Sequence, residues 1–400
     1  MLFRMTQGGD MAWLRDKKEV SIPKIGLILA GGGARAAYQV GVLRAIARMR
    51  APLTENPFPI ICGTSAGAIN AAALSIYAKD FQDAVARLQG VWGHFHVHQV
   101  FRSDFPALSK NALHWLASML LGGLGRYNPV SLFDREPLRE LLDHYLPCDQ
   151  LVDVLASGAL DALSVTASGY NSGQSVTFYQ SRETIEPWRR ATRVGCPTNI
   201  TLDHLMASSA IPFIFEAVKL NREYFGDGSM RQLAPISPAL HLGADKVLVI
   251  GVKYEGDDDY VREKIDEYPS MAHIGGHVLN SIFLDGMDVD LERLQRINKT
   301  LGLIPRRRLV DGTELKPVEV LTICPSRDIS KIAQSHAHHM PRMLRYFMGG
   351  IGAMKDDGTS LLSYLLFEQA YCRELIALGY NDTLKRREDL VRFLGDSSVL

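Results

Sequence analysis

The stretch ICGTSAGAIN at residues 61–70 places a hydroxyl where it could act as a nucleophile. Ser65 lies between Gly63 and Gly67, after a short apolar run and before the alanine-rich, helix-like segment 66–78. A Gly-x-Ser-x-Gly turn between a strand and a helix exposes the serine Oγ on a sharp turn that only small neighbours allow. The N-terminus of the following helix would favour the negative charge that develops during attack. The competing interpretation is a structural turn, because glycine and serine are common in loops.

A second glycine-rich turn, in LILAGGGARAAYQVG, follows the apolar run 25–30. Read from Gly31 it gives G-x-G-x-x-A, a weak form of the dinucleotide-binding fingerprint. That fingerprint requires an acidic residue about 20 residues later at a strand end, but Glu55 lies in the loop-like PLTENP. The other interpretation is an oxyanion hole, in which consecutive glycines leave backbone N–H groups unobstructed. Since both turns follow strands, they can open onto one sheet edge, and this pairing favours catalysis.

The residue that takes the proton of Ser65 is less evident from the sequence. The chain has 12 histidines, so a Ser-His-Asp hydrolase is not excluded by their number. The runs HFHVH at 94–98 and HAHH at 336–339 also suggest a metal site. No HExxH spacing accompanies them, and packed or solvated histidines explain them more simply. We therefore expect neither a metal nor a cofactor.

Asp227 is the other candidate for a proton acceptor. It is flanked by Gly226 and Gly228 and follows the short strand-like segment 223–225. Such an aspartate either shapes a tight turn, which is frequent, or is a carboxylate held against another group. Taken alone, the residues around Asp227 favour the role in shaping a turn.

The elements that must position these residues follow a regular order. The order strand, glycine turn, helix occurs at 25–49 and again at 59–78, and the apolar residues of both helical segments recur at helical spacing. Two successive units of this kind favour a parallel sheet with helices on its faces. The alternating segments around Asn171-Ser172-Gly173 predict a hairpin. Further expected elements are a helix at 202–210, buried strands at 246–252 and 318–323, an amphipathic helix at 287–301, and helices from about Thr359 onward. No repeat or linker divides the chain.

Composition excludes several classes of protein. Lys+Arg and Asp+Glu balance at 44 each, and there is no long basic run, so nucleic acid is not an expected partner. The first 22 residues are interrupted by charges and form no signal-peptide core. No apolar run approaches the ~20 residues that span a bilayer. The five cysteines are scattered and form no CxxC pair, which is typical of reduced thiols. We expect a cytoplasmic protein.

Taken together, GGGARA, GTSAG and GDGS, in this order, resemble the patatin-like phospholipase family in its bacterial members. The segment ASSAIPFIF at 207–215, the helix at 287–301 and GYND at 379–382 are also similar, so the resemblance covers nearly the whole chain. It implies a patatin-like three-layer α/β/α sandwich with a mainly parallel central sheet, elaborated by extra helices. The corresponding division is a lead-in at 1–22, a catalytic core at 23–252 and a helical and strand extension at 253–400 packed on the same domain.

The resemblance also implies a Ser-Asp dyad without histidine, in which Ser65 is the nucleophile and Asp227 takes its proton directly. It places the following residues in the oxyanion loop: Gly31, Gly32, Gly33, Ala34 and Arg35. Because an aspartate with an ordinary pKa near 3.9 is a weak base, the dyad requires a desolvated Asp227 and a short Ser-Asp contact. Two residues depart from the family pattern. Ala36 stands where glycine is usual, and Ser229 where alanine or glycine is usual.

The implied activity is hydrolysis of lipid acyl esters, of the phospholipase A or lysophospholipase type, through an acyl-enzyme. The expected partner is a lipid at a membrane or lipid-droplet surface, with the protein peripheral to the membrane. Two apolar segments, 117–125 and 340–354, are candidates for an acyl-binding lid or for a contact with a bilayer. The alternative is that they are edges of core helices. Arg342 and Arg345 in the second segment would suit anionic headgroups. Alternative functions are an acyltransferase on a related fold, which would be expected to use histidine, and a non-catalytic lipid-surface protein.

Overall fold

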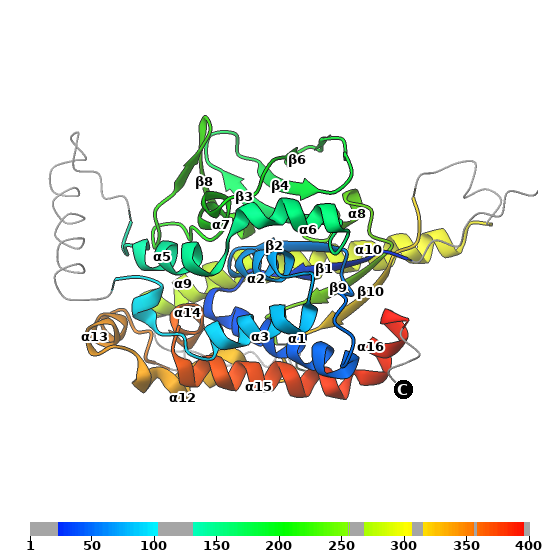
Figure 1. The fold of residues 1–400 in the computed structure, drawn as a ribbon. Coiled ribbons are helices and arrows are strands. Elements are labelled where there is room, and N and C mark those ends of the chain that lie inside the picture. Colours follow the sequence, from blue (N-terminus) through cyan, green and yellow to red (C-terminus); the bar gives the residue numbers. More distant parts are fainter. Residues whose placement is uncertain are drawn as a thin grey trace, which may run out of the picture.

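The computed structural model describes residues 23–102, 131–254, 256, 268–305, 315–355 and 358–395. These residues contain a ten-stranded mixed sheet in the order β10-β9-β1-β2-β3-β4-β6-β5, with β8 pairing with β3 and β7 (Figure 1). The strands are β1 (Ile25–Leu29), β2 (Ile60–Thr64), β3 (Ala162–Gly169), β4 (Ser175–Ser181), β5 (Trp188–Arg189), β6 (Arg193–Pro197), β7 (Val218–Leu220), β8 (Glu223–Asp227), β9 (Lys246–Ile250) and β10 (Glu319–Ile323). The run from β10 to β3 is parallel throughout.

Helices surround this sheet. The longer ones are α1 (Ala37–Arg50), α2 (Ala66–Ile76), α3 (Phe81–Trp92), α5 (Glu136–Tyr145), α9 (Met271–Asn280), α10 (Gly286–Gly302), α13 (Arg342–Gly350) and α15 (Gln369–Lys385). The shorter ones are α6 (Leu151–Ser157), α7 (Leu202–Ser208), α8 (Ser237–His241), α12 (Ile329–His336), α14 (Thr359–Leu365) and α16 (Arg387–Leu394). Within the described residues, no helix combines the length and the apolar character needed to cross a membrane.

The parallel strands are buried on both faces, so their side chains divide between two apolar cores. Leu27 and Leu29 of β1 belong to the core that contains α1, α2, α3 and α15. Ile28, between them, belongs to the core that contains α8 and α10. This alternation is the period of two that a strand imposes. Burial on both faces explains why β1 and most of β2 are apolar. The expected α/β fold, with a mostly parallel central sheet flanked by helices, is confirmed.

Strand β3 is longer than β2, and this difference brings another strand to the end of β2. β2 pairs with β3 in parallel up to Thr64, which lies opposite Thr166. The next residue of β3, Ala167, pairs instead with Asp227 at the end of the antiparallel strand β8. Because β4 occupies the other edge of β3, β2 and β8 meet along one edge. The residue after Thr64 and the last residue of β8 therefore become neighbours.

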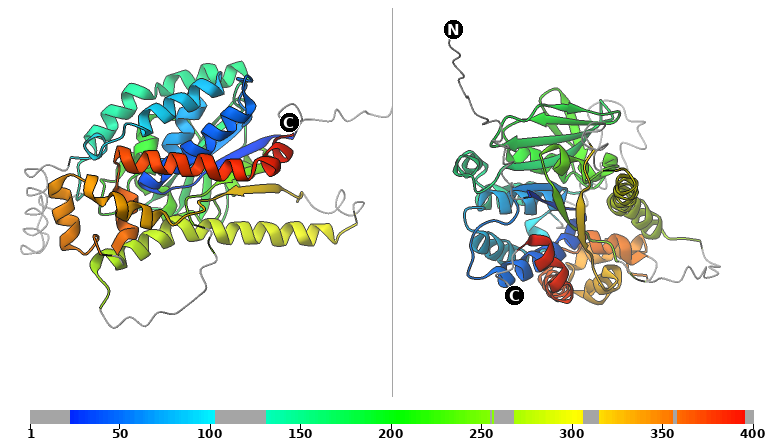
Figure 2. Two further views of the ribbon diagram at one scale, coloured as in Figure 1. Left: turned by 90° about the horizontal axis from the view of Figure 1, so that it is seen from below. Right: turned by 90° about the vertical axis from the view of Figure 1, so that its right-hand side faces the viewer.

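The C-terminal part of the chain packs directly on the N-terminal part. β10 pairs with β9 in the central sheet, and α15 lies along α1 (Figure 2, left). Two glycines allow the two helix backbones to approach closely. A β-carbon on Gly41 would lie 2.0 Å from the carbonyl oxygen of Ile376, and one on Gly379 would lie 2.2 Å from that of Tyr38. Glycine in GYND thus serves helix packing.

Most of the elements expected from the sequence are present at nearly the expected positions. The hairpin is β3–β4, the two later strands are β9 and β10, and the chain after Thr359 is helical. Within the first strand-turn-helix unit, α1 begins only at Ala37 because residues Gly33–Ala36 form a 3-10 turn. Segments 1–22 and 117–125 lie outside the described residues.

We expect Gly379→Ala to lower the free energy of unfolding by about 1–3 kcal/mol, because its methyl group would overlap the α1 backbone. The matched control is Gly90→Ala in α3, where a β-carbon meets nothing within 4 Å. That change should raise stability by about 0.5–1 kcal/mol through helix propensity alone. Urea unfolding followed by circular dichroism measures both. Equal effects of the two substitutions would contradict the close contact of α1 and α15.

Candidate active site

Ser65 occupies a strained turn between β2 and α2. Its φ of 55° and ψ of −131° lie in a region that non-glycine residues rarely adopt, and its backbone N–H donates to Ser208 Oγ at 2.9 Å. The flanking glycines permit this turn. A β-carbon on Gly67 would lie 2.2 Å from the carbonyl oxygen of Leu29, and one on Gly63 would lie 2.5 Å from Cα of Ala68. The sharp turn predicted from the Gly-x-Ser-x-Gly pattern is therefore present.

The side chains of Ser65 and Asp227, which the family resemblance pairs, are in contact. Ser65 Oγ donates to Asp227 Oδ2 at 2.5 Å, although the two residues lie 162 positions apart in the chain. The other carboxylate oxygen, Oδ1, accepts from the backbone N–H of Ser229 at 2.9 Å. A β-carbon on Gly228 would lie 2.0 Å from the carbonyl oxygen of Thr166, so glycine is required where β8 turns past β3. No histidine among the described residues is hydrogen-bonded to either member of the pair.

Burial changes the proton affinity of this carboxyl group. Asp227 is fully buried and Ser65 is 1% exposed. Removal from water disfavours the charged carboxylate and raises the pKa of Asp227 from 3.8 to about 6. Hydrogen bonds from Ser65 and Ser229, and the positive charge of Arg135, oppose this rise in pKa but do not cancel it. A carboxylate in this environment accepts a proton more readily than one in water, yet it is still ionised at neutral pH.

The glycine-rich turn lies beside Ser65. A β-carbon on Gly31 would lie 3.1 Å from Cβ of Ser65 and 2.4 Å from Oγ of Ser229. Gly33 has a φ of 54°, and a β-carbon there would lie 2.3 Å from the carbonyl oxygen of Tyr364. Among the described residues, no acceptor pairs with the backbone N–H groups of the turn at Gly31, Gly32, Gly33 and Ala34. These groups remain available to a negatively charged oxygen bound next to Ser65.

The part of the chain that contains Ser65, Asp227 and the glycine turn identifies its family. A family model described as patatin-like phospholipase matches residues 27–240, more than half of the chain. The chain belongs to the patatin-like phospholipase family. The matched range contains the glycine turn, Ser65 and Asp227, and membership indicates a lipid hydrolase.

Comparison with solved structures adds two distant similarities. The chain is similar to VipD from Legionella pneumophila, with a TM-score of 0.37, 11% identity and coverage of 92% of this chain and 67% of VipD. It is also similar to the type III effector protein ExoU, with a TM-score of 0.29, 13% identity and coverage of 94% of this chain and 61% of ExoU. No curated protein sequence gives a significant match. The family assignment rests on the family model.

The two departures from the patatin-like pattern fit the local backbone. Ala36 has a φ of −64°, in the right-handed region that alanine adopts readily, so glycine is not required there. Ser229 is accommodated beside Gly31 and supplies its backbone N–H to Asp227. Neither residue obstructs the turn or the Ser-Asp pair.

The side chain of Arg35 connects the glycine turn to α9 and α14. Its backbone N–H donates to the carbonyl oxygen of Gly32 at 3.1 Å, so this N–H is not free for a ligand. Its guanidinium donates to Ser363 Oγ at 2.8 Å and lies over the ring of Tyr364, 4.0 Å from the ring centre. Asn280 Oδ1 accepts another of its N–H groups at 3.4 Å. Arg35 therefore belongs to the turn predicted from the resemblance but holds it to α9 and α14.

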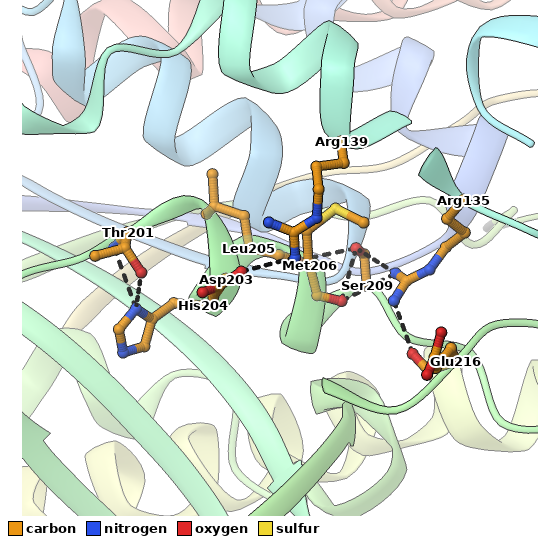
Figure 3. A network of polar contacts seen from close by, with 9 residues as sticks. All are labelled: Arg135, Arg139, Thr201, Asp203, His204, Leu205, Met206, Ser209 and Glu216. Carbon is orange, nitrogen blue, oxygen red and sulfur yellow. Dashed lines mark hydrogen bonds and ion pairs between the residues drawn. The ribbon is translucent and has the colours of Figure 1, made fainter. Parts of the chain in front are cut away.

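Figure 3 shows a buried arginine that sequence reasoning missed, Arg135, with its contacts to Met206, Ser209 and Glu216. Arg135 donates to the carbonyl oxygens of Met206 at 2.9 Å and Glu216 at 2.8 Å, and to Ser209 Oγ at 3.3 Å. It thereby connects the start of α5 to the end of α7 and the loop after it. That loop supports Asp227, whose N–H donates to the carbonyl oxygen of Ala210 at 2.8 Å. Burial lowers the pKa of Arg135 to about 10. Nothing in the sequence DREPLREL distinguishes Arg135 from a surface arginine.

An apolar channel begins at Ser65 and follows α2. Ser65, Ile69, Ala73 and Tyr77 line it at the spacing of one helix face. The 11 residues of α2 span about 16 Å. The opposite walls come from α3, α5 and adjoining loops: Leu88, Val91, Trp92, Phe95, Val100, Leu138, Leu141, Leu142, Leu146, Ile211, Phe215 and Phe367. The space in the channel and the open solvent at its mouth together measure about 870 Å³. Its lining suits a hydrocarbon chain attached to an ester at Ser65.

The histidine-rich runs serve other contacts. His96 pairs with Glu368, Nδ1 to Oε2 at 2.9 Å, and His336 pairs with Glu374, Nε2 to Oε2 at 2.7 Å. Residues Val97–Gln99 form a 3-10 turn, so the first run does not present alternate histidines on one strand face. In the described part of the chain, no group of three or more metal-binding side chains gathers.

The raised pKa of Asp227 predicts a pH-dependent effect of Asp227→Asn on stability. Below about pH 4 the folded and unfolded wild-type chains both carry a protonated carboxyl group. As the pH rises from about 4 through about 6, the carboxyl group of Asp227 ionises in the unfolded chain before it ionises in the folded chain. The wild type therefore loses stability over this range, and the asparagine variant, whose side chain does not ionise, keeps it. A pKa moved from 3.8 to about 6 corresponds to about 3 kcal/mol. The variant should therefore gain up to about 3 kcal/mol relative to wild type between pH 4 and 7.

Urea unfolding of both proteins at pH 4, 5.5 and 7 measures this gain. Asp153→Asn, at an exposed position of α6, is the control and should show no comparable trend. A stability difference that is independent of pH, or that falls as the pH rises, would contradict the burial effect at Asp227.

Proposed function

We propose that the protein is a lipid acyl hydrolase of the phospholipase A or lysophospholipase type, a serine esterase with a Ser-Asp dyad. The observation that carries this proposal is the 2.5 Å hydrogen bond from Ser65 Oγ to Asp227 at the start of an apolar channel. A hydroxyl bonded to a carboxylate at this distance is a charge-assisted pair. Its position beside free backbone N–H groups matches the requirements of acyl transfer.

In the first half of the reaction, ionised Asp227 accepts the proton of Ser65 while Oγ attacks the carbonyl carbon of the ester. The carbonyl oxygen becomes negative, and N–H groups of the glycine turn donate to it. One such donor contributes about 3 kcal/mol in comparable enzymes. The bond to the alcohol then breaks, and the leaving oxygen takes the proton from Asp227. The acyl group remains on Ser65 as an ester.

In the second half, water replaces the alcohol. Asp227 accepts a proton from this water as its oxygen attacks the acyl carbon, and the same N–H groups stabilise the second negative oxygen. Collapse of this intermediate returns the proton to Ser65 Oγ and releases the fatty acid. The enzyme is restored without a cofactor, and each proton is transferred through Asp227.

The channel supports a lipid over a short polar ester. Its walls are mostly apolar, with Ser65, Ser209, Arg87 and the tyrosines Tyr77 and Tyr145 as the polar residues of the lining. Burying each methylene of a substrate is favourable by about 0.8 kcal/mol. The substrate class proposed is accordingly the long-chain acyl ester of a phospholipid, lysophospholipid or neutral glycerolipid.

We expect Ser65→Ala to lower kcat for p-nitrophenyl acyl esters by at least about 10³-fold, because the nucleophile is lost. The same variant should release no fatty acid from phospholipid vesicles, as measured by lipid mass spectrometry. Ser75→Ala, at a buried serine of α2 that does not line the channel, is the control and should keep activity. Equal rates for wild type and Ser65→Ala would refute the hydrolase. Acyl transfer to an added alcohol in place of water would indicate an acyltransferase.

The channel predicts a substitution that changes chain-length preference. Ala73 lies eight residues from Ser65 on the channel face of α2, which is about 12 Å along the helix. An extended acyl chain advances about 1.3 Å per carbon, given C–C bonds of about 1.5 Å. Ala73→Leu would therefore obstruct chains longer than about nine carbons.

The expected result for Ala73→Leu is a loss of about tenfold or more in kcat/KM for p-nitrophenyl palmitate, since two or more methylenes lose their contacts at about 0.8 kcal/mol each. Activity on p-nitrophenyl butyrate should stay within about twofold of wild type. Ala86→Leu, on the exposed side of α3, should alter neither rate. An equal loss for the short and the long ester would show that position 73 does not contact the acyl chain.

A further inference from the structure

The end of the molecule formed by α9 and α13 exposes apolar side chains on two neighbouring helices. On α9, Met271, Ile274 and Val278 follow one helix face at spacings of three and four residues, and Met271 is 73% exposed. On α13, Tyr346 is 82% exposed and Met343 is 40% exposed. We refer to these five side chains as the docking face. The two helices lie at the same end of the molecule in Figures 1 and 2, and the N–H of Ala272 donates to the carbonyl oxygen of Ile351, just after α13.

The two segments that carry the docking face contain basic residues and no acidic ones, and acidic residues bound each segment in the sequence: Glu267 and Asp285 the first, Asp328 and Asp356 the second. Residues 268–284, which contain α9, include no acidic residue. Residues 329–355, which contain α12 and α13, include none either. The second range carries the cations Lys331, Arg342, Arg345 and Lys355. The nearby Glu374 of α15 is paired with Arg327 and His336. A chain whose formal net charge is zero thus presents the exposed cation Arg342 beside exposed apolar side chains on α13.

This surface is attached directly to the candidate active site. Asn280, the last residue of α9, accepts hydrogen bonds from Tyr364 at 2.9 Å and from Arg35 of the glycine turn at 3.4 Å. The helix continues as a π-turn at Ser281–Asp285, and Phe283 in that turn lies next to Gly31. π-turns are rare and occur frequently at functional sites. The docking face and Ser65 are therefore parts of one packed unit.

We propose that the docking face binds the surface of an anionic lipid bilayer and so brings the proposed hydrolase to its substrate. Exposed aromatic and aliphatic side chains next to cations have the composition of a surface that enters the headgroup region of a membrane. Each lysine or arginine near an anionic surface strengthens binding about fivefold. The sequence suggested a bilayer contact at 340–354 only; the structure adds α9 to it.

Vesicle co-sedimentation of the full chain tests this proposal independently of catalysis. Wild type should sediment with phosphatidylglycerol–phosphatidylcholine vesicles, bind pure phosphatidylcholine vesicles at least about tenfold more weakly, and lose binding as salt rises. Arg342→Glu and Tyr346→Glu should each weaken binding to the anionic vesicles by about tenfold or more. Both variants should hydrolyse p-nitrophenyl butyrate at the wild-type rate.

The matched controls are Lys299→Glu in α10 and Leu303→Glu just after it, where Leu303 is 81% exposed and lies at the far end of α10 from α9. They should bind vesicles as wild type does. Equal binding by Tyr346→Glu and wild type, or equal binding to neutral and anionic vesicles, would overturn the docking proposal. So would light scattering that shows a wild-type dimer dissociated by Tyr346→Glu, since a second copy would then cover the face. If vesicles are bound but Ser65→Ala and wild type are equally active, the hydrolase fails and the docking face stands.

Discussion

The short hydrogen bond between Ser65 and Asp227 depends on the register of one strand. β3 pairs with β2 up to Thr166 and with β8 from Ala167 onward, so two segments far apart in sequence end at the same point of one sheet edge. A shift of one residue in this register would turn Asp227 toward the other face of the sheet. The glycines around the pair follow from the same constraint. They stand where a β-carbon would overlap a neighbouring backbone, as at Gly67 and Gly228.

Burial gives the carboxylate its chemistry and also makes it unfavourable for the fold. A solvated aspartate would be too weak a base, and an isolated buried one would be protonated at neutral pH. The hydrogen bonds of Ser65 and Ser229 and the charge of Arg135 leave the pKa of Asp227 at about 6, between these limits. Arg135 contributes in a second way, since it fixes the loop whose carbonyl at Ala210 holds the backbone of Asp227. The same buried groups thus maintain both the position of Asp227 and its proton affinity.

The C-terminal third of the chain contributes to the site without supplying a reacting group. Tyr364 packs its backbone against Gly33 and its ring against Arg35, and Phe367 forms part of the channel wall. α15 lies against α1, which follows the glycine turn. The turn that offers its N–H groups is consequently held from both sides. In the proposed function, this arrangement joins the acyl channel, the oxyanion turn and the docking face in one rigid core.

The sequence by itself determined the local features: the two strand-turn-helix units, the hairpin and the residue types of Ser65, Asp227 and the glycine turn. These depend on apolar periodicity and on glycine, which act over a few residues. The residues around Asp227 favoured a role in shaping a turn, and only the family resemblance favoured a contact with the serine. Tertiary structure decided the meeting of Ser65 and Asp227, the buried position of Arg135, the channel along α2 and the joining of α9 to the glycine turn. Each of these requires contact between segments tens to hundreds of residues apart, and side-chain types and spacing carry no record of such pairings.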